Sequence, residues 1–551
     1  MTAAEMAAKR DTRVLTGVGV GALCASGTLH FWKKKRREAQ PYRGAREEKR
    51  AFSDALLRAR ERTAVLARRT EDAAGEDAAA IFEIHDMLLA DADFSEGVRR
   101  KIDGGKTAAK AVEAVAEEMA AVFEAMADEY FAARAADMRD VGSRVVDELL
   151  GGGGELPDGR VIIVADELTP SDTVAFDSDK VLGFVTFGGS VNSHTAILAR
   201  ALAIPALVRV GEISDEYDGA EALLDAENGT LTLFPTPDML LKFATAESAR
   251  RAEEQRLRAL ISLPAITRSG KKIGLFANIG GISGAEEAYR AGADGIGLFR
   301  SEFLFLGRDT LPSEEEQYQA YSRVARIMKD RGGPVVVRTL DAGSDKVVAV
   351  LAGEKEENPA LGVRGIRLLL SHPDVLRTQL RALCRASAHG KIAIMLPMVV
   401  SVKEIVGAKE IFEGVRRELA AEGVPMAERI PFGVMIETPA AAIMARELAA
   451  EADFFSVGTN DLCQYTLAAD RQNSALAHLS QSEADLECVF RLIKNAADAI
   501  HAHGDGKWIG ICGELAADTA LTARFLECGA DELSVSPPFL LKLKEKIRLI
   551  D

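Results

Sequence analysis

One histidine of this sequence occupies a position where it could do chemistry. The stretch GGSVNSHTAILAR, residues 188–200, places His194 between a glycine-rich turn and a run of helical character. In the simpler interpretation, Asn192 or Ser193 caps the helix and His194 faces solvent. In the other interpretation the imidazole is catalytic. The motif alone leaves both possibilities open.

Polar side chains also recur directly after short apolar runs in the second half of the chain. They are Arg300, Arg338, Asp341, Glu437, Asn460, Asp461, Cys512 and Glu514, joined in nearby segments by Arg364, Arg367 and Arg471. Arginines can clamp phosphate and carboxylate groups in forked geometry. Glu437 and Asp461 offer the hard oxygen ligands that Mg²⁺ prefers. Cys512 could be a nucleophile or a proton donor. The set predicts a site for a small, highly charged anion and a divalent cation.

The apolar runs that precede these residues predict a barrel. From residue 272 onward they are KIGLFANI, GIGLFR, PVVVRTLD, KIAIMLPMV, FGVMIET, FFSVGTND, WIGICGE and ELSVSP, separated by segments of helical character. Eight strand–helix units in about 280 residues match the size of a (β/α)8 TIM barrel, whose chemistry lies at the carboxyl ends of the strands. An open doubly wound sheet is the alternative.

The first half of the chain divides differently. Residues 33–147 are rich in Ala, Glu and Arg and predict a helical domain, with Ile81, Ile84, Met87 and Leu88 on one face. Residues 13–32 and 148–235 predict an α/β domain around His194, preceded by a tail, 1–12. Residues 236–264 predict a charged helical linker to a barrel domain, 265–551.

Net charge, cysteine spacing and the apolar segment 14–32 bear on which partners and which cellular compartment the protein can have. The net charge of -16 argues against a nucleic-acid binder. Six cysteines without paired spacing suggest neither disulfides nor zinc, which fits a reducing cytoplasm. Residues 14–32 carry no formally charged side chain and precede KKKRR, but their glycines favour a strand over a membrane helix. We therefore expect a cytoplasmic protein without membrane insertion.

Seven motifs follow one another along nearly the whole chain. They are VTFGGSVNSHTAILARALAIPAL, GLFRSEFLF, VVVRTLDAGSDK, NPALGVRGIR, GVMIETPAA, FFSVGTNDLCQYTLAADRQN and ICGELAAD. In this order they resemble enzyme I of the bacterial phosphoenolpyruvate-dependent sugar phosphotransferase system. The resemblance implies a multidomain α/β protein that moves a phosphoryl group from phosphoenolpyruvate, by way of a histidine, to the carrier protein HPr, releasing pyruvate.

The resemblance also assigns roles to matching residues. His194 matches the phosphorylated histidine, and Cys512 matches the acid that protonates the enolate carbon. Glu437 and Asp461 match Mg²⁺ ligands. The residues that match substrate-binding positions are Arg300, Arg338, Lys346, Arg364, Asn460, Asp461 and Arg471. The resemblance further implies HPr binding by the helical domain and a homodimer formed through the barrel.

Some features depart from the family pattern. Ser190 and Asn192 stand where the family commonly has glycine and threonine before the histidine, and this difference could change the rate of phosphoryl transfer.

Two alternative functions remain open. One alternative is a catalytically impaired or regulatory enzyme I paralogue. The other is a relative of pyruvate phosphate dikinase without its nucleotide domain, because no nucleotide-binding glycine loop precedes His194.

Overall fold

The computed structural model describes residues 11–551 except 22–23, 33–40, 75, 126–128, 152–158, 177–179, 190–195, 197–198, 201–203, 306–309, 344–350, 352–355, 471–472, 474–475, 477–478, 480–482 and 505. Ser190, Asn192, His194, Lys346 and Arg471 therefore lie outside the described residues. The chain forms two compact units, Met1–Ser248 and Ala249–Asp551.

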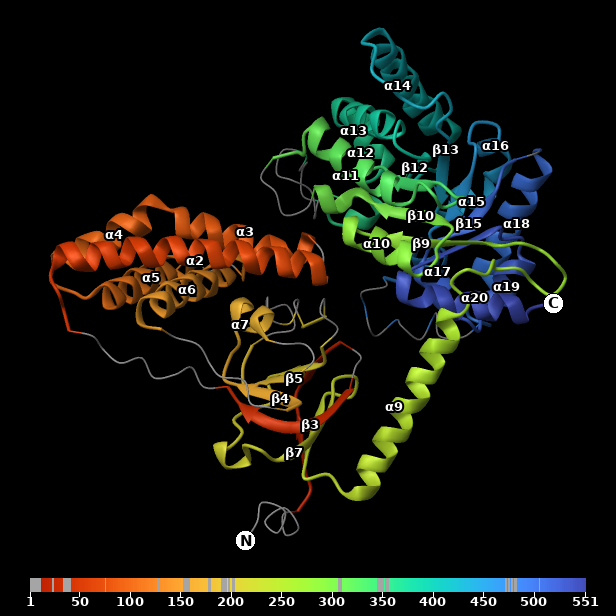
Figure 1. The fold of residues 1–551 in the computed structure, drawn as a ribbon. Helices are drawn as coiled ribbons and strands as arrows, with labels where there is room; N and C mark the ends of the chain where they lie inside the picture. The colour runs from red at the N-terminus through yellow and green to blue at the C-terminus, as the bar shows by residue number, and fades with distance from the viewer. Residues whose placement is uncertain are drawn as a thin grey trace. The chain divides into compact units, whose positions relative to one another are not determined.

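Helices make up one part of the first unit. They are α2 (Ala45–Ala74), α3 (Glu76–Ala90), α4 (Ala92–Asp103), α5 (Ala108–Glu124) and α6 (Glu129–Leu150), drawn in red and orange in Figure 1. Asp91 and Thr107 cap α4 and α5 by accepting backbone N–H bonds from the first turn. Phe52, Phe94 and Met138 pack in the core between the helices. Packing of these apolar stripes holds the bundle together.

The face predicted for α3 is partly wrong. Ile81 is buried as expected, but Met87 is 72% exposed and the fully buried positions are Phe82, His85 and Leu89. Both ring nitrogens of His85 have hydrogen-bond partners within the bundle: Nδ1 lies 2.9 Å from Arg144 Nη2, and Nε2 lies 3.4 Å from Asp137 Oδ1. A polar residue with buried partners therefore replaces Met87 on the inner face, which hydrophobic periodicity does not reveal.

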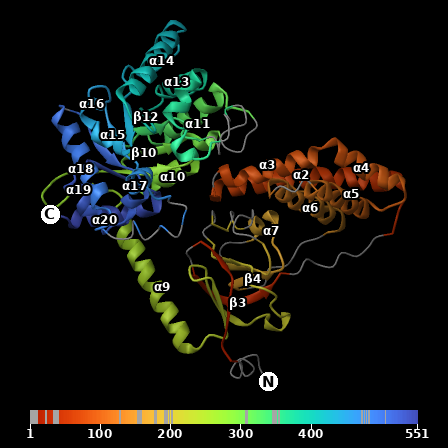
Figure 2. The ribbon, with the colours of Figure 1, turned by 180° about the vertical axis from the view of Figure 1, so that it is seen from behind.

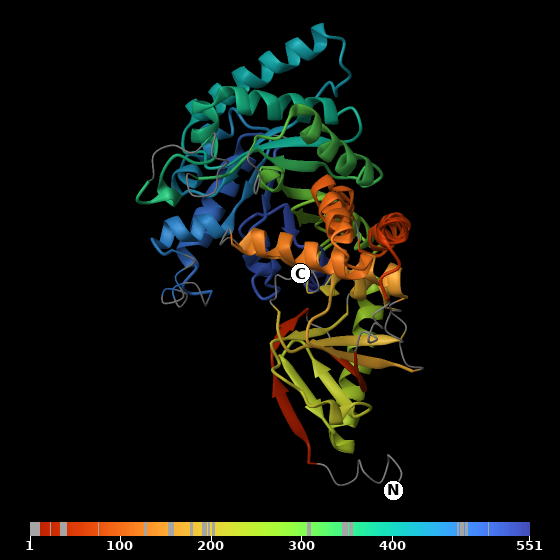
Figure 3. The same ribbon diagram turned by 90° about the vertical axis from the view of Figure 1, so that its left-hand side faces the viewer.

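A curved sheet forms the rest of the first unit. Its order is β1-β8-β7-β3-β4-β5-β6-β2. The strands are β1 (Arg13–Thr16), β2 (Val18–Val20), β3 (Cys24–Phe31), β4 (Val161–Ala165), β5 (Val181–Thr186), β6 (Ala206–Val208), β7 (Glu221–Asp225) and β8 (Thr230–Leu233). β3 to β6 are parallel, while β7, β8, β1 and β2 pair antiparallel to their neighbours. Figure 3 shows the red N-terminal strands beside the yellow ones. β4 is buried on both faces, which explains its continuous apolar sequence.

Residues 14–32 form three strands rather than the single strand predicted. β1 and β2 lie at opposite edges of the sheet with only Gly17 between them, so the sheet must curl strongly there. A Cβ on Gly17 would lie 2.8 Å from the carbonyl oxygen of Val208, so this crossing requires glycine. Among the described residues, no helix has the length and apolar character needed to cross a bilayer.

The second unit contains a closed parallel barrel, and this confirms the predicted fold class. Its strands are β9 (Gly274–Ile279), β10 (Gly295–Arg300), β11 (Val335–Arg338), β12 (Ile392–Leu396), β13 (Phe432–Ile436), β14 (Phe455–Val457), β15 (Ile509–Ile511) and β16 (Glu532–Val535). Each pairs parallel with the next, and β16 pairs with β9 to close the circle. The alternative of an open doubly wound sheet is thereby excluded.

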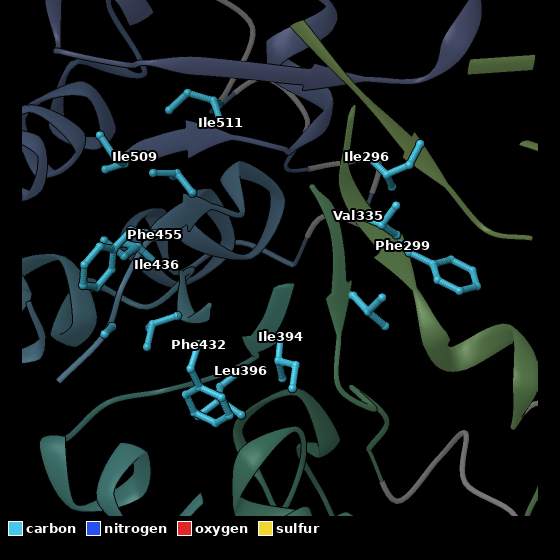
Figure 4. Packing of buried hydrophobic residues seen from close by; sticks show 14 of the residues in the cluster. Ile296, Phe299, Val335, Ile394, Leu396, Phe432, Ile436, Phe455, Ile509 and Ile511 are labelled. Atoms are coloured by element: carbon cyan, nitrogen blue, oxygen red, sulfur yellow. The ribbon is translucent and has the colours of Figure 1, made fainter. Parts of the chain in front are cut away.

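Helices surround the barrel (Figure 2). They include α10 (Ile282–Arg290), α11 (Glu314–Ile327), α12 (Ile366–Ser371), α13 (Pro373–Ala386), α14 (Val402–Ala421), α15 (Pro439–Ile443), α16 (Ala445–Leu448), α17 (Thr459–Leu467), α18 (Glu487–Ala502), α19 (Thr522–Glu527) and α20 (Leu540–Leu549). Ile296, Phe299, Phe432 and Phe455 point outward from their strands into the main core (Figure 4). Helix α9 (Pro237–Arg258) lies inside the predicted linker. The predicted domain boundaries themselves stay predictions.

The barrel lumen is filled by a separate set of side chains and contains one buried carboxyl group. Leu298, Met395 and Phe454 belong to this inner cluster. Glu532 is 4% exposed, and its Oε2 accepts a 3.1 Å bond from the indole Nε1 of Trp508. Burial raises the pKa of Glu532 from its ordinary 4.5 to about 8, against the effect of the indole bond. Glu532 is therefore mostly protonated at neutral pH.

This pKa shift predicts that Glu532→Gln increases the free energy of unfolding by an amount that depends on pH. The folded state holds the proton that the unfolded state releases above pH 4.5, so wild-type stability falls between pH 4.5 and about 8. The slope should reach about 1.4 kcal/mol per pH unit. Glutamine mimics the protonated acid. Urea unfolding should therefore find the variant equal to wild type near pH 4.5 and more stable at pH 8. A difference that does not change with pH would contradict the assignment.

Candidate active site

A cavity opens at the carboxyl ends of the barrel strands and collects most of the predicted polar set. Its volume is about 300 Å³. The predicted residues that line it are Arg300, Arg338, Asp341, Arg364, Glu437, Asn460, Asp461, Cys512 and Glu514. They come from β10, β11, α17 and the segments that follow the strands. Closure of the barrel brings them together, because parallel strands end on the same rim.

Two arginines are held in place by carboxylates. Arg364 pairs with Asp341 through two bonds, Nη2 to Oδ2 at 2.8 Å and Nε to Oδ1 at 3.2 Å. Arg338 lies 3.2 Å from Asp341 Oδ2 and donates to Glu302 Oε1 at 3.1 Å. Burial opposes the charge of both guanidinium groups, but the surrounding carboxylates raise the pKa of each above its usual range. Both arginines are therefore permanent, preoriented cations beside the cavity.

Sequence reasoning missed Glu302, which organises this pair of arginines. Glu302 is 9% exposed, and its Oε1 also accepts the backbone N–H of Asp341 at 2.8 Å. Burial raises the pKa of this carboxyl group, while the charge of Arg338 lowers it. The signal in the sequence was its place two residues after Arg300, at the end of β10.

A second group of acids could hold a metal ion. Carboxylate oxygens of Asp341, Glu437 and Asp461 lie within 4.8 Å of one another. Glu437 Oε2 and Asp461 Oδ1 are buried and have no hydrogen-bond partner among the residues that the structure describes. Burial raises the pKa of Glu437 to about 8, and the neighbouring charges of Asp341 and Asp461 add to the effect. A divalent cation would satisfy these oxygens and relieve their repulsion, so the residues fit Mg²⁺.

Asn460 and Glu514 bond each other across the rim. The amide Nδ2 of Asn460 donates to Glu514 Oε1 at 2.9 Å, and Asn460 Oδ1 accepts the backbone N–H of Glu514 at 2.8 Å. The two segments approach so closely that a Cβ on Gly513 would lie 1.8 Å from Thr459 Oγ1. Glycine at position 513 therefore permits the contact between the ends of β14 and β15.

Cys512 lines the cavity and directly follows β15. It is 2% exposed, and its backbone N–H and thiol both approach the carbonyl oxygen of Val457, at 3.0 Å and 3.5 Å. Burial raises the pKa of this thiol to about 12. Cys512 is therefore a neutral thiol at physiological pH, which suits proton donation better than nucleophilic attack.

The remaining predicted residues behave differently. Arg300 is exposed at the mouth of the cavity. Arg367 does not line it and instead donates to the carbonyl oxygens of Leu361 and Gly362. Tyr465, which the sequence did not single out, accepts a 3.2 Å bond from Arg364 and donates to the carbonyl oxygen of Ala360. His194, Lys346 and Arg471 lie outside the described residues.

Comparisons with known proteins identify the family. Residues 254–551 match the model of the PEP-utilising enzyme PEP-binding domain, 14–134 the N-terminal domain, and 157–229 the mobile domain. The phosphoenolpyruvate-protein phosphotransferase of Staphylococcus carnosus is 40% identical over 91% of this chain and 87% of its own length. The chain belongs to the phosphoenolpyruvate-protein phosphotransferase family.

One further relative and one solved structure are also similar to this chain. The phosphoenolpyruvate-protein phosphotransferase of Haemophilus influenzae is 42% identical over 87% of this chain and 83% of its own length. A solution NMR structure of an enzyme I protein is 32% identical and covers 43% of this chain and 99% of its own, with a TM-score of 0.37. In this chain, the residues that line the cavity all lie in the segment, 254–551, that matches the PEP-binding domain model.

The raised pKa of Cys512 predicts slow, strongly pH-dependent alkylation. Its thiolate fraction should increase about tenfold per pH unit below the pKa, because only the thiolate reacts. Cys488, exposed at the start of α18, is an internal control. Peptide mass spectrometry after iodoacetamide treatment at pH 7.5 should find Cys488 modified and Cys512 unmodified. Alkylation of the two at similar rates would contradict the burial and protonation state assigned to Cys512.

Proposed function

We propose that this phosphotransferase takes the phosphoryl group of phosphoenolpyruvate onto His194, releases pyruvate, and passes the group to the histidine of HPr. The single observation that carries the proposal is the cavity at the barrel rim, where preoriented arginines, buried carboxylate oxygens that accept no hydrogen bond among the described residues, and a buried thiol meet. The curated relatives carry the matching name. The reaction would be the first step of sugar uptake by the phosphotransferase system.

The charge distribution of the cavity supports binding of phosphoenolpyruvate. Arg338 and Arg364 are buried and fixed by carboxylates, so their N–H groups need little reorganisation to receive phosphate or carboxylate oxygens. Arg300 stands at the mouth, where it can meet the substrate as it enters. We assign Asn460, Asp461, Lys346 and Arg471 to the same anion on their match to the family pattern.

Glu437 and Asp461 would hold Mg²⁺. Glu437 Oε2 and Asp461 Oδ1 support this assignment, because both are buried and accept no hydrogen bond among the described residues, and the nearest arginine nitrogens lie 3.9 Å and 3.7 Å away. When bound, the ion would neutralise charge on the substrate's oxygens. Glu437 is steadied for this task by the backbone N–H of Met398, which donates to its Oε1 at 2.6 Å.

Cys512 would supply the proton that converts enolpyruvate to pyruvate. Its thiol is neutral and lies beside Leu298 and Met435, which line the same cavity. Apolar neighbours suit the methylene end of the substrate, while the arginines suit its charged end. In the step, the S–H bond breaks and a C–H bond forms at the enolate carbon.

We assign HPr binding to the helical domain, 33–147. Leu57, Val65 and Met87 on α2 and α3 are 61%, 48% and 72% exposed, which supports an apolar contact there. The exposed Glu83 can frame such a contact, whereas the Asp91 carboxylate is already engaged in capping α4. His85 is buried and partnered, so a structural role suits it better than phosphoryl transfer. A homodimer formed through the barrel and a cytoplasmic location complete the proposal.

A pyruvate assay tests the proposed reaction. The purified chain with phosphoenolpyruvate, Mg²⁺ and HPr should release pyruvate continuously, and omission of HPr should limit release to about one equivalent per chain. Binding of phosphoenolpyruvate without pyruvate release would instead support the impaired or regulatory paralogue.

The division of labour between domains predicts what a fragment can do. A fragment ending near residue 236 retains His194 and the helical domain but lacks the cavity. It should exchange phosphate reversibly with phospho-HPr and should not be phosphorylated by phosphoenolpyruvate. Gel shift of phosphorylated HPr measures the exchange. Phosphorylation of this fragment by phosphoenolpyruvate would refute the assignment of substrate binding to the barrel.

A further inference from the structure

An asparagine in the barrel wall is bonded directly to the backbone of Cys512. Asn278 is the fifth residue of β9, and its Nδ2 donates to the carbonyl oxygen of Cys512 at 2.8 Å and to that of Ser534 at 3.0 Å. Its Oδ1 accepts the hydroxyl of Ser534 at 2.7 Å. Both amide hydrogens and the amide oxygen are thus engaged, which fixes the orientation of the side chain.

These bonds hold Cys512 where regular strand pairing stops. β15 ends at Ile511, and only its residues Gly510 and Ile511 pair with β16. On one side of Cys512, its N–H reaches the carbonyl oxygen of Val457 on β14 at 3.0 Å. On the other side, the Asn278 side chain, which comes from β9, reaches past β16 and donates to the carbonyl oxygen of Cys512. The peptide units flanking the thiol are therefore anchored to the barrel from two directions.

We infer that Asn278 is a positioning residue that sets the direction of the Cys512 thiol toward the substrate. The inference rests on the proposed role of Cys512 as proton donor. The thiol must deliver its proton to one face of the enolate carbon, and a displacement of about 1 Å can reduce such a step by about 100-fold. Ser534 supports the arrangement by holding the amide oxygen.

The geometry selects the variant that tests this role. Asp in place of Asn278 keeps the shape but replaces the donating NH₂ group with an oxygen, which would face two carbonyl oxygens. Ser534→Ala is milder and removes only the bond to Oδ1. Asn495→Asp is the matched control, because Asn495 is exposed on α18.

The experiment uses the full chain with phosphoenolpyruvate labelled stereospecifically with tritium at its methylene carbon, in D₂O, so that protonation of the enolate carbon places H, D and T on the methyl group. Wild type and Asn495→Asp should give a chiral methyl group in pyruvate. Asn278→Asp should lower turnover by about 10- to 100-fold with a KM within about threefold of wild type. The pyruvate it forms should lose methyl chirality.

A double variant separates positioning from general damage. If Asn278 acts through Cys512, Asn278→Asp combined with Cys512→Ala should turn over no more slowly than Cys512→Ala alone. Additive losses would overturn the inference, as would a chiral product and wild-type turnover in Asn278→Asp. If Asn278→Asp fails to fold, Ser534→Ala should still reduce chirality, and an unchanged product would overturn the inference. Normal turnover of Cys512→Ala would instead refute the proposed proton donor itself.

Discussion

Closure of eight parallel strands puts the carboxyl end of every strand on one rim, and the chemistry of this chain depends on that constraint. Arg338 ends β11, Glu437 follows β13, and Cys512 follows β15, so residues far apart in sequence surround one cavity. The lumen below is filled by apolar side chains and by the protonated carboxyl group of Glu532. A filled lumen gives the rim a rigid base.

The rim concentrates charges that would be unstable alone. Asp341, Glu437 and Asp461 lie close enough to repel one another, and burial strengthens the effect. The carboxylate of Asp341 pairs with both Arg338 and Arg364. Arg338 also pairs with Glu302. Breaking one member of such a buried network costs about 3–5 kcal/mol in typical proteins, because it leaves an unpaired charge. Entry of an anion and a cation together would keep this balance, which is consistent with the proposed substrate and metal.

The sequence predicted the barrel well because its strands are buried on both faces and appear as separate apolar runs. The polar residues after those runs could be recognised for the same reason. Tyr465 and Asn278 escaped notice because their importance lies in contacts with residues 101 and 234 positions away in sequence, which no local pattern encodes. Glu302 was overlooked although it stands two residues after Arg300, at the end of β10. Residues 14–32 were predicted as one strand since the sharp crossing at Gly17 depends on the distant carbonyl of Val208. Met87 was misplaced because buried His85 took its position on the inner face.

The proposed function depends on passage of the phosphoryl group through His194, and mapping a phosphate label on the chain tests this step. The full chain is incubated with phosphoenolpyruvate labelled in its phosphate, together with Mg²⁺, and digested under alkaline conditions. We expect a base-stable, acid-labile label on the peptide containing His194 and none on the His194→Ala variant. Label retained by His194→Ala, or found on another residue of the wild-type chain, would contradict the proposed passage through His194.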